Sequence, residues 1–130
     1  MTTELKVDAE LPDLSAGELL QRYRERSLSP VQVTQAVLAR IEVLQPRFNA
    51  YRLVDVQGAL EQARASEARW QRGAPQGLLD GVPVAFKDLL HVKGWPTRKG
   101  SLATAETPQA EDSPAAARLR ESGAVLLGKT

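Results

Sequence analysis

Apolar positions in the first half of the chain recur with a helical period. A first helix is expected to begin after Ser15, which forms a capping-box pattern with Glu18, and to end near 26–27. A second is expected to begin after Ser29, with proline at its first position, and to stop at Pro46. Its apolar residues lie at spacings of four, four and three and are Val33, Val37, Ile41 and Leu44. Such a stripe is typical of a face packed in a core, which we favour over a ligand site.

The next segments predict a short strand and a third helix. Residues 49–54 suit a strand, and Asp55 is placed to cap a helix that runs to about Arg72 and closes at Gly73. The stretch 73–77 is rich in glycine and proline and predicts a connector.

After this connector the pattern changes to an apolar run over 78–90, which indicates a buried strand. The two-residue period of a strand divides its middle into two faces: Val82, Val84 and Phe86 on one, and Pro83, Ala85 and Lys87 on the other. A loop over 93–101, a helix from Ser113 to Gly123 and a second buried strand over 124–127 are expected to follow. This order predicts an α/β sheet covered by helices.

Composition excludes several classes of site. The chain has 130 residues with 17 Lys and Arg against 16 Asp and Glu, so its charge favours neither nucleic acid nor an anionic membrane as partner. No cysteine is present, which excludes disulfides, a thiolate nucleophile and a cysteine zinc site. The one histidine, His91, is too few for a multi-histidine metal site and is expected to be a partly exposed packing residue. Catalysis by this protein would therefore need a base other than histidine.

The sequence carries no targeting signal of the common kinds. Residues 1–14 mix charged and apolar side chains, unlike a signal peptide, and no stretch approaches the ~20 apolar residues of a membrane span. We therefore expect a cytoplasmic protein.

Lys87 is the most informative single residue, because it ends an apolar run. An ammonium group buried without a partner is costly and tends to lose its proton, and a neutral lysine is a general base. The alternative is a lysine at the end of a strand that reaches solvent or pairs with an acid such as Asp88.

The run Gly-Val-Pro-Val-Ala-Phe-Lys-Asp from Gly81 to Asp88 resembles the N-terminal part of the amidase signature family, which includes bacterial amidases and the A subunit of the tRNA-dependent amidotransferase. The resemblance extends over about 14–130. The further elements that carry it are Ser29-Pro30, Arg40-Ile-Glu42, Pro46, Asn49-Ala50, Gly94-Trp-Pro-Thr97, Gly100-Ser101, Glu111-Asp112-Ser113, Ala117-Arg-Leu-Arg120 and Gly123-Ala-Val-Leu-Leu-Gly-Lys-Thr130.

This resemblance implies a fold and a mechanism. The chain would be the first part of one amidase signature domain, with a polar tail over 1–13, a helical segment over 15–73 and the start of the core sheet over 78–130. Lys87 would be the lysine of a Ser-cisSer-Lys triad, taking a proton through one serine from the serine that attacks the amide. The implied partner is a small-molecule amide, with self-association or a second polypeptide as partner subunit a further expectation, and no cofactor or metal.

Both triad serines are expected outside this chain. Ser101 and Ser113 do not lie in a Gly-Ser-Ser context, and Ser113 suits a helix cap. We therefore expect the isolated 130 residues to be inactive. The alternative is a non-catalytic truncated or interaction polypeptide, and the unpaired strand edges of an incomplete sheet predict association or poor solubility of the chain alone.

A competing motif lies at 123–130, which matches the phosphate-loop pattern G-x-x-x-x-G-K-[ST]. That loop needs a strand before the first glycine and a helix after the lysine. Here a predicted helix precedes Gly123 and the spacer residues favour a strand, so nucleotide binding through Lys129 is disfavoured. Of the remaining residues, Trp70 and Trp95 are expected to be apolar anchors, and Arg98 and Lys99 make their loop locally basic.

Overall fold

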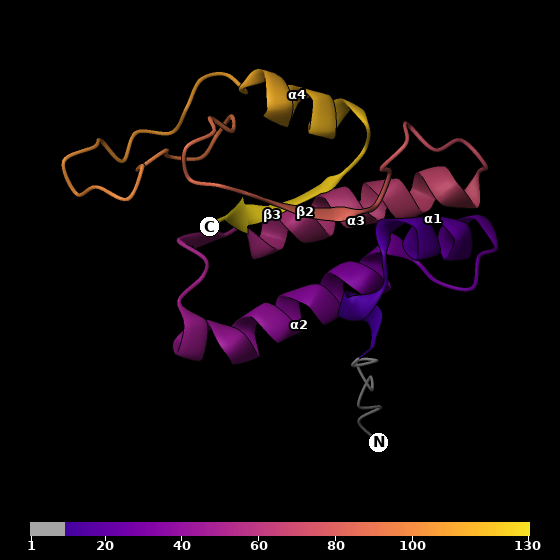
Figure 1. The fold of residues 1–130 in the computed structure, drawn as a ribbon. Helices are drawn as coiled ribbons and strands as arrows, with labels where there is room; N and C mark the ends of the chain where they lie inside the picture. Colours follow the sequence, from indigo (N-terminus) through magenta and orange to yellow (C-terminus); the bar gives the residue numbers. More distant parts are fainter. Residues whose placement is uncertain (1–9) are drawn as a thin grey trace.

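The computed structural model describes residues 10–130, in which a three-stranded sheet lies between helices (Figure 1). The strand order is β1-β3-β2, with β1 antiparallel and β2 parallel to the central β3. The elements in chain order are η1 (Leu11–Asp13), α1 (Ala16–Arg24), α2 (Pro30–Phe48), β1 (Leu53–Val54), α3 (Val56–Gln71), β2 (Pro83–Phe86), α4 (Pro114–Glu121) and β3 (Val125–Lys129). The expected α/β class is confirmed.

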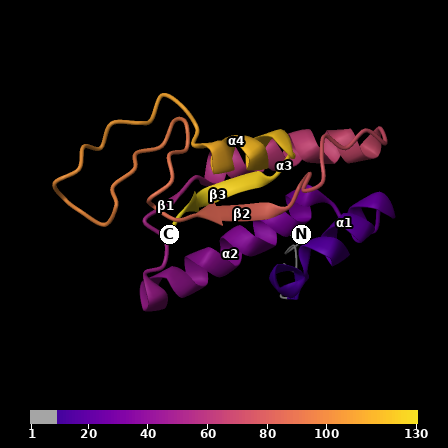
Figure 2. The same ribbon diagram turned by 45° about the horizontal axis from the view of Figure 1, so that its top comes forward.

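Two apolar clusters place α4 on one face of the sheet and α3 on the other (Figure 1), and Figure 2 shows β2 and β3 running side by side. On one face, α4 covers a cluster that includes Phe86, Trp95 and Leu126. On the other, α3 packs its small residues Ala59 and Ala63 against β3, and α2 lies beside α3. Small side chains let α3 approach the sheet closely, so the central strand is buried over its whole length.

Each long helix begins at a side-chain cap, as the sequence predicts. Ser15 Oγ accepts the N–H of Glu18 at 3.2 Å, and the Glu18 carboxylate accepts the N–H of Ser15 at 2.7 Å. Ser29 begins α2 with the same reciprocal pair, and Asp55 and Ser113 cap α3 and α4. These caps satisfy N–H groups that a helix leaves without partners, so the starts of the helices are fixed locally.

The predicted end of α2 at Pro46 is wrong, because the helix continues to Phe48. A proline lacks the N–H that bonds the carbonyl four residues back, but this loss matters least in the last turn. Asn49 closes the helix instead, in the left-handed conformation at φ 45°, with its N–H bonded to the Gln45 carbonyl at 2.8 Å.

The predicted strand over 78–90 is too long, since β2 covers only Pro83–Phe86. The chain turns before it at Gly81, whose φ of 85° lies in the left-handed region. The predicted division of faces is confirmed: Val82 and Phe86 are buried, whereas Ala85 and Lys87 are exposed. The prediction of a fully buried strand is therefore wrong for one face.

The other strand boundaries shift by a few residues. The strand expected over 49–54 is limited to β1, and the one expected over 124–127 is β3, which extends to Lys129. Of the expected polar tail over 1–13, residues 1–9 lie outside the described part of the chain, and Leu11 begins the short helix η1 with a buried side chain. Within residues 10–130, no helix combines the length and the apolar character that crossing a membrane requires.

Candidate active site

Lys87 directly follows β2 and is held at the end of the sheet by Thr130. The N–H of Thr130 bonds the Phe86 carbonyl at 2.8 Å, and the N–H of Asp88 bonds the Thr130 carbonyl at 2.8 Å. The Lys87 side chain is exposed, and its ammonium donates to the Thr130 carbonyl at 3.3 Å. The backbone of this lysine is therefore fixed on both sides, while its amine remains accessible.

The side chain of Asp88, unlike that of Lys87, is buried in the protein, where positively charged groups lie close to it. Its side chain is 7% exposed, and both carboxylate oxygens lie 3.2 Å from the Arg98 backbone nitrogen. The ammonium of Lys129 is 3.3 Å away and Arg52 Nε is 3.6 Å away. Asp88 therefore pairs with the buried Lys129 and not with Lys87, which the sequence offers as its alternative partner.

Lys129 is the buried lysine of this region, with a relative exposure of 0%. Its ammonium donates to the Leu90 carbonyl at 2.5 Å and to Thr97 Oγ1 at 2.8 Å. Burial lowers its pKa, and the hydrogen bond and charge of Asp88 partly oppose this shift. Sequence reasoning missed this role because it considered Lys129 only as a phosphate ligand, although a lysine that ends a run of strand formers needs a buried partner.

The interpretation of 123–130 as a phosphate loop does not fit the geometry. Residues 125–129 form β3, and every one of them is buried. The N–H of Val125 bonds the Val82 carbonyl at 2.9 Å, and that of Leu126 bonds Gln62 Oε1 at 2.9 Å. A phosphate loop needs backbone N–H groups that are free to meet an anion, and these are occupied.

The other polar residues singled out from the sequence have structural roles. Ser113 caps α4, and Ser101 Oγ accepts the Ala103 N–H at 3.1 Å. His91 is exposed, and its carbonyl accepts the Ser113 N–H at 2.8 Å. Both hydroxyls accept backbone N–H groups of their own turns, and the Lys87 ammonium bonds the Thr130 carbonyl and neither of these serines.

The predictions for the two tryptophans are confirmed, whereas the prediction for the loop over 93–101 is wrong in part. Trp95 is buried against Phe86, with ring centroids 6.5 Å apart, and Trp70 packs on Tyr23 at 5.9 Å, so both tryptophans are anchors as expected. The expected basic character of the loop is wrong for Arg98, which is buried and forms an ion pair with Glu106.

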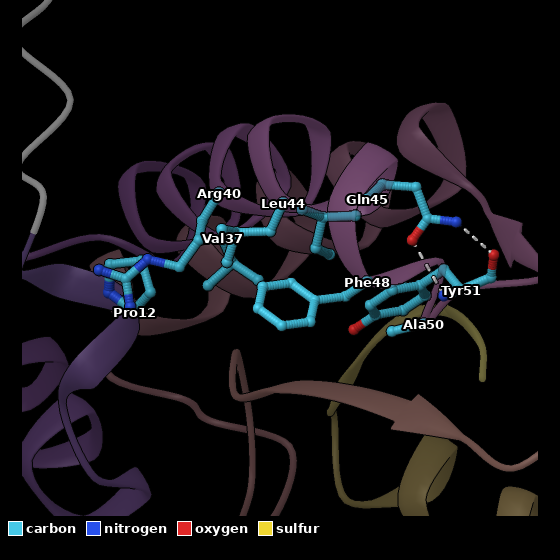
Figure 3. Close-up of a pocket in the computed structure, with 9 residues that line it drawn as sticks. Pro12, Val37, Arg40, Leu44, Gln45, Phe48, Ala50 and Tyr51 are labelled. Atoms are coloured by element: carbon cyan, nitrogen blue, oxygen red, sulfur yellow. Dashed lines mark hydrogen bonds between the residues drawn. The ribbon is translucent and has the colours of Figure 1, made fainter.

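A separate apolar hollow of about 320 Å³ lies beside the C-terminal half of α2 (Figure 3). In the close-up, Phe48 and Tyr51 both line the hollow, and the Gln45 amide exchanges two hydrogen bonds with the Tyr51 backbone, at 2.6 and 3.0 Å. Its charged residue, Arg40, pairs with Asp13 at 2.5 Å. This hollow offers apolar surface without a nucleophile or a base. Among residues 10–130 no cluster of three or more His, Asp or Glu is suited to hold a metal.

The segment that holds Lys87 is shared with known proteins. The family model described as Amidase matches residues 32–130, which include β2, Lys87 and the whole of β3. The chain belongs to the amidase family. This finding confirms the resemblance carried by the residues from Gly81 to Asp88.

Relatives within the family agree with this assignment. The chain is 46% identical over 121 residues to the A subunit of the glutamyl-tRNA(Gln) amidotransferase of Salinispora arenicola, covering 93% of this chain and 25% of that protein. Among solved structures, the peptide amidase of Stenotrophomonas maltophilia has a TM-score of 0.86 at 31% identity and is matched over 94% of this chain and 25% of its own. A bacterial aryl acylamidase of the amidase signature enzymes has a TM-score of 0.81 at 30% identity, over 90% of this chain and 25% of its own. The chain thus spans about a quarter of the length of these relatives.

Proposed function

We propose that this chain is the first quarter of an amidase signature hydrolase and that Lys87 is the base of its catalytic triad. The observation that carries the proposal is the position of Lys87. It follows a strand inside the segment that matches the family, its backbone is bonded on both sides to the end of β3, and its amine is exposed. A base needs this combination of a fixed backbone and an accessible amine.

In the proposed reaction, the neutral Lys87 amine takes a proton from a serine held in a cis peptide, and that serine takes one from the nucleophilic serine. The serine oxygen forms a bond to the amide carbon, the carbon–nitrogen bond breaks, and the amine leaves with a proton returned along the same path. Water then cleaves the acyl-enzyme by the same steps. Backbone N–H groups would stabilise the oxyanion of each tetrahedral intermediate.

Both serines are proposed to lie outside the 130 residues, in the part of the domain that follows. The isolated chain would then hold one third of a triad and would not hydrolyse amides. An exposed β2 edge in this segment fits that arrangement, since β2 is an outer strand of the sheet formed by residues 10–130.

The first test is to read the gene beyond codon 130 and to assay the complete product. A reading frame that continues into a Gly- and Ser-rich stretch with paired serines supports the proposal, and a stop codon directly after Thr130 would favour the non-catalytic alternative. The complete protein should then be screened with aliphatic amides, aryl amides, urea derivatives and glutamine.

The substrate screen also separates a self-sufficient amidase from one component of an amidotransferase. The relative at 46% identity is named as a subunit, so we consider a partner polypeptide for this protein as well. Hydrolysis of simple amides by the purified protein alone would indicate an independent amidase. Release of ammonia from glutamine only after a partner co-purifies would indicate an amidotransferase component.

A further inference from the structure

A second hollow, of about 370 Å³, lies between the end of α1, the start of α2 and the end of α3. We call it the interhelical hollow. The aromatic, charged and amide side chains that line it are Tyr23, Arg26, Gln32, Glu67, Trp70 and Gln71. Its volume falls in the range of roughly 300–1,000 Å³ that is usual for small-molecule sites. Lys87 is not one of its lining residues, so the interhelical hollow is separate from the proposed active site.

The aromatic wall of the interhelical hollow is held in place from behind. Trp70 Nε1 donates to the Asp80 carbonyl at 3.1 Å, and Tyr23 Oη donates to the Gly81 carbonyl at 3.0 Å. The two rings also pack on each other, with centroids 5.9 Å apart. Because Tyr23 is buried and Trp70 is partly exposed, Trp70 is the ring that a ligand would contact. A wall that is already ordered costs a ligand little on binding.

Glu67 brings a carboxylate without a partner to this wall. It lies three residues before Trp70 on α3, so the two side chains lie on the same side of the helix. The Glu67 side chain is partly buried, and its carboxylate forms no ion pair or hydrogen bond with any group of residues 10–130. A carboxylate in this position favours a ligand that donates charge-assisted hydrogen bonds, such as an ammonium group.

Arg26 brings the opposite charge, in a backbone conformation that is unusual for arginine. It follows α1 at φ 59°, in the left-handed region where glycine is usual after a helix. Its Nη2 donates to the Gln71 carbonyl at 2.9 Å, which holds the guanidinium against the end of α3. The other guanidinium N–H groups have no partner in the described part of the chain, and no ion pair joins Arg26 to Glu67. The interhelical hollow therefore holds one unpaired charge of each sign.

These two charges select the class of ligand. A simple anion would be repelled by Glu67 and a simple cation by Arg26, because both side chains line the same hollow. A molecule with both an ammonium and a carboxylate group satisfies both charges, and its apolar part can lie on Trp70. We propose that the interhelical hollow binds a free amino acid with an apolar or aromatic side chain. The ammonium of the ligand donates to Glu67, and its carboxylate accepts from Arg26.

Isothermal titration calorimetry of the complete protein tests this site with three probes. L-phenylalanine carries both charges, 2-phenylethylamine lacks the carboxylate and 3-phenylpropionate lacks the ammonium. We expect L-phenylalanine to bind with a Kd of about 1 mM or lower, and each of the other probes to bind at least about tenfold more weakly. None of the three probes contains an amide bond, so amide hydrolysis would not disturb the titration.

Variants of the two charged residues locate the site. Glu67→Gln, and Arg26→Gly at a φ that glycine adopts readily, should each raise the Kd of L-phenylalanine at least about tenfold. Arg26→Lys keeps the charge and should raise the Kd less than Arg26→Gly. Glu61→Gln and Arg64→Gln are the matched controls, since both residues are exposed on α3 and do not line the interhelical hollow. These controls should leave the Kd unchanged.

The proposal does not rest on amide hydrolysis, and Lys87→Ala separates the two sites. Selective binding of L-phenylalanine that is weakened in Glu67→Gln and Arg26→Gly and kept in Lys87→Ala supports the proposal. Equal binding of 2-phenylethylamine would overturn it and indicate a site for cations. Absence of binding up to about 10 mM, or binding that is lost in Lys87→Ala and kept in Glu67→Gln, would overturn it as well. If circular dichroism shows that a variant is unfolded, the comparison of the three probes on the wild type still decides.

Discussion

Replacing Asp80 by asparagine tests the buried ion pair that anchors the turn before β2. The Asp80 carboxylate is fully buried and accepts Arg69 Nε at 2.7 Å, Arg69 Nη2 at 2.6 Å and the Gln76 N–H at 2.6 Å. Removing one charge of a buried pair typically costs about 3–5 kcal/mol. Arg69 keeps some access to water, with 18% exposure, so we expect the lower end, a loss of about 3 kcal/mol in the free energy of unfolding.

The loss should also depend on pH in a defined direction. Burial alone would raise the pKa of Asp80, but the hydrogen bonds from Arg69 and Gln76 hold it below its ordinary value. A lowered folded-state pKa stabilises the fold above the unfolded value of about 3.9, and this contribution disappears as the pH falls through the folded-state value. The gap between wild type and Asp80→Asn should therefore be constant from about pH 5 to 8 and narrow below about pH 4.

Urea unfolding followed by tryptophan fluorescence measures this gap, because Trp70 Nε1 donates to the Asp80 carbonyl at 3.1 Å. Asp13→Asn is the control, since Asp13 forms an ion pair with Arg40 on the surface, and its midpoint should shift much less. Equal stability of Asp80→Asn and wild type at pH 7 would refute the reasoning. A gap that persists unchanged at acid pH would refute the assigned charge state.

Three further predictions concern the fold. Gly94→Ala should lower the free energy of unfolding by about 1 kcal/mol, because alanine is strained at φ 88°. Gly123→Ala, at φ 85°, should lower it by more than about twice that amount, because the added Cβ would also stand 2.7 Å from Asp80 Cγ. Equal urea midpoints for the two variants would contradict this. Ser29→Ala removes the cap of α2 and should lower stability by about 1 kcal/mol in a thermal melt, and an unchanged melt would argue against the cap. Burial and the charge of Asp80 raise the pKa of Tyr23, so its phenolate absorbance should appear only well above pH 10. Comparison with Tyr23→Phe identifies the absorbance of this residue. Ionisation of Tyr23 near pH 10 with the fold intact would contradict the prediction.

Local signals in the sequence predict the helices well and the strands less well. The starts at Ser15, Ser29 and Ser113 depend on a side chain that bonds an N–H three residues later, so a short stretch of sequence is sufficient. The end of α2 depends on the free energy lost with one missing hydrogen bond in the last turn. The position of Pro46 in the sequence does not by itself reveal this free energy, so it does not locate the end of the helix. The start of β2 follows the turn at Gly81, and the residue before that turn, Asp80, is held by Arg69 from a distant part of the chain.

The candidate site is predictable only in part, for a related reason. The position of Lys87 follows from a motif along the chain, and its placement on the face opposite Phe86 follows from the two-residue period, whereas the exposure of that face does not. The pairing of Asp88 with Lys129 joins residues far apart in sequence and depends on the parallel register of β2 and β3. A pattern of single residues carries no such register, so the sequence alone does not reveal the buried role of Lys129.

The most direct test of the central claim is the effect of Lys87→Ala on kcat/KM for amide hydrolysis by the complete protein, with Lys93→Ala as the control. If Lys87 is the base of the triad, its loss should lower kcat/KM by about 10³-fold or more, with KM changed far less and Lys93→Ala near wild type. A Lys87→Ala protein that is folded and hydrolyses amides within about threefold of the wild-type rate would contradict the account.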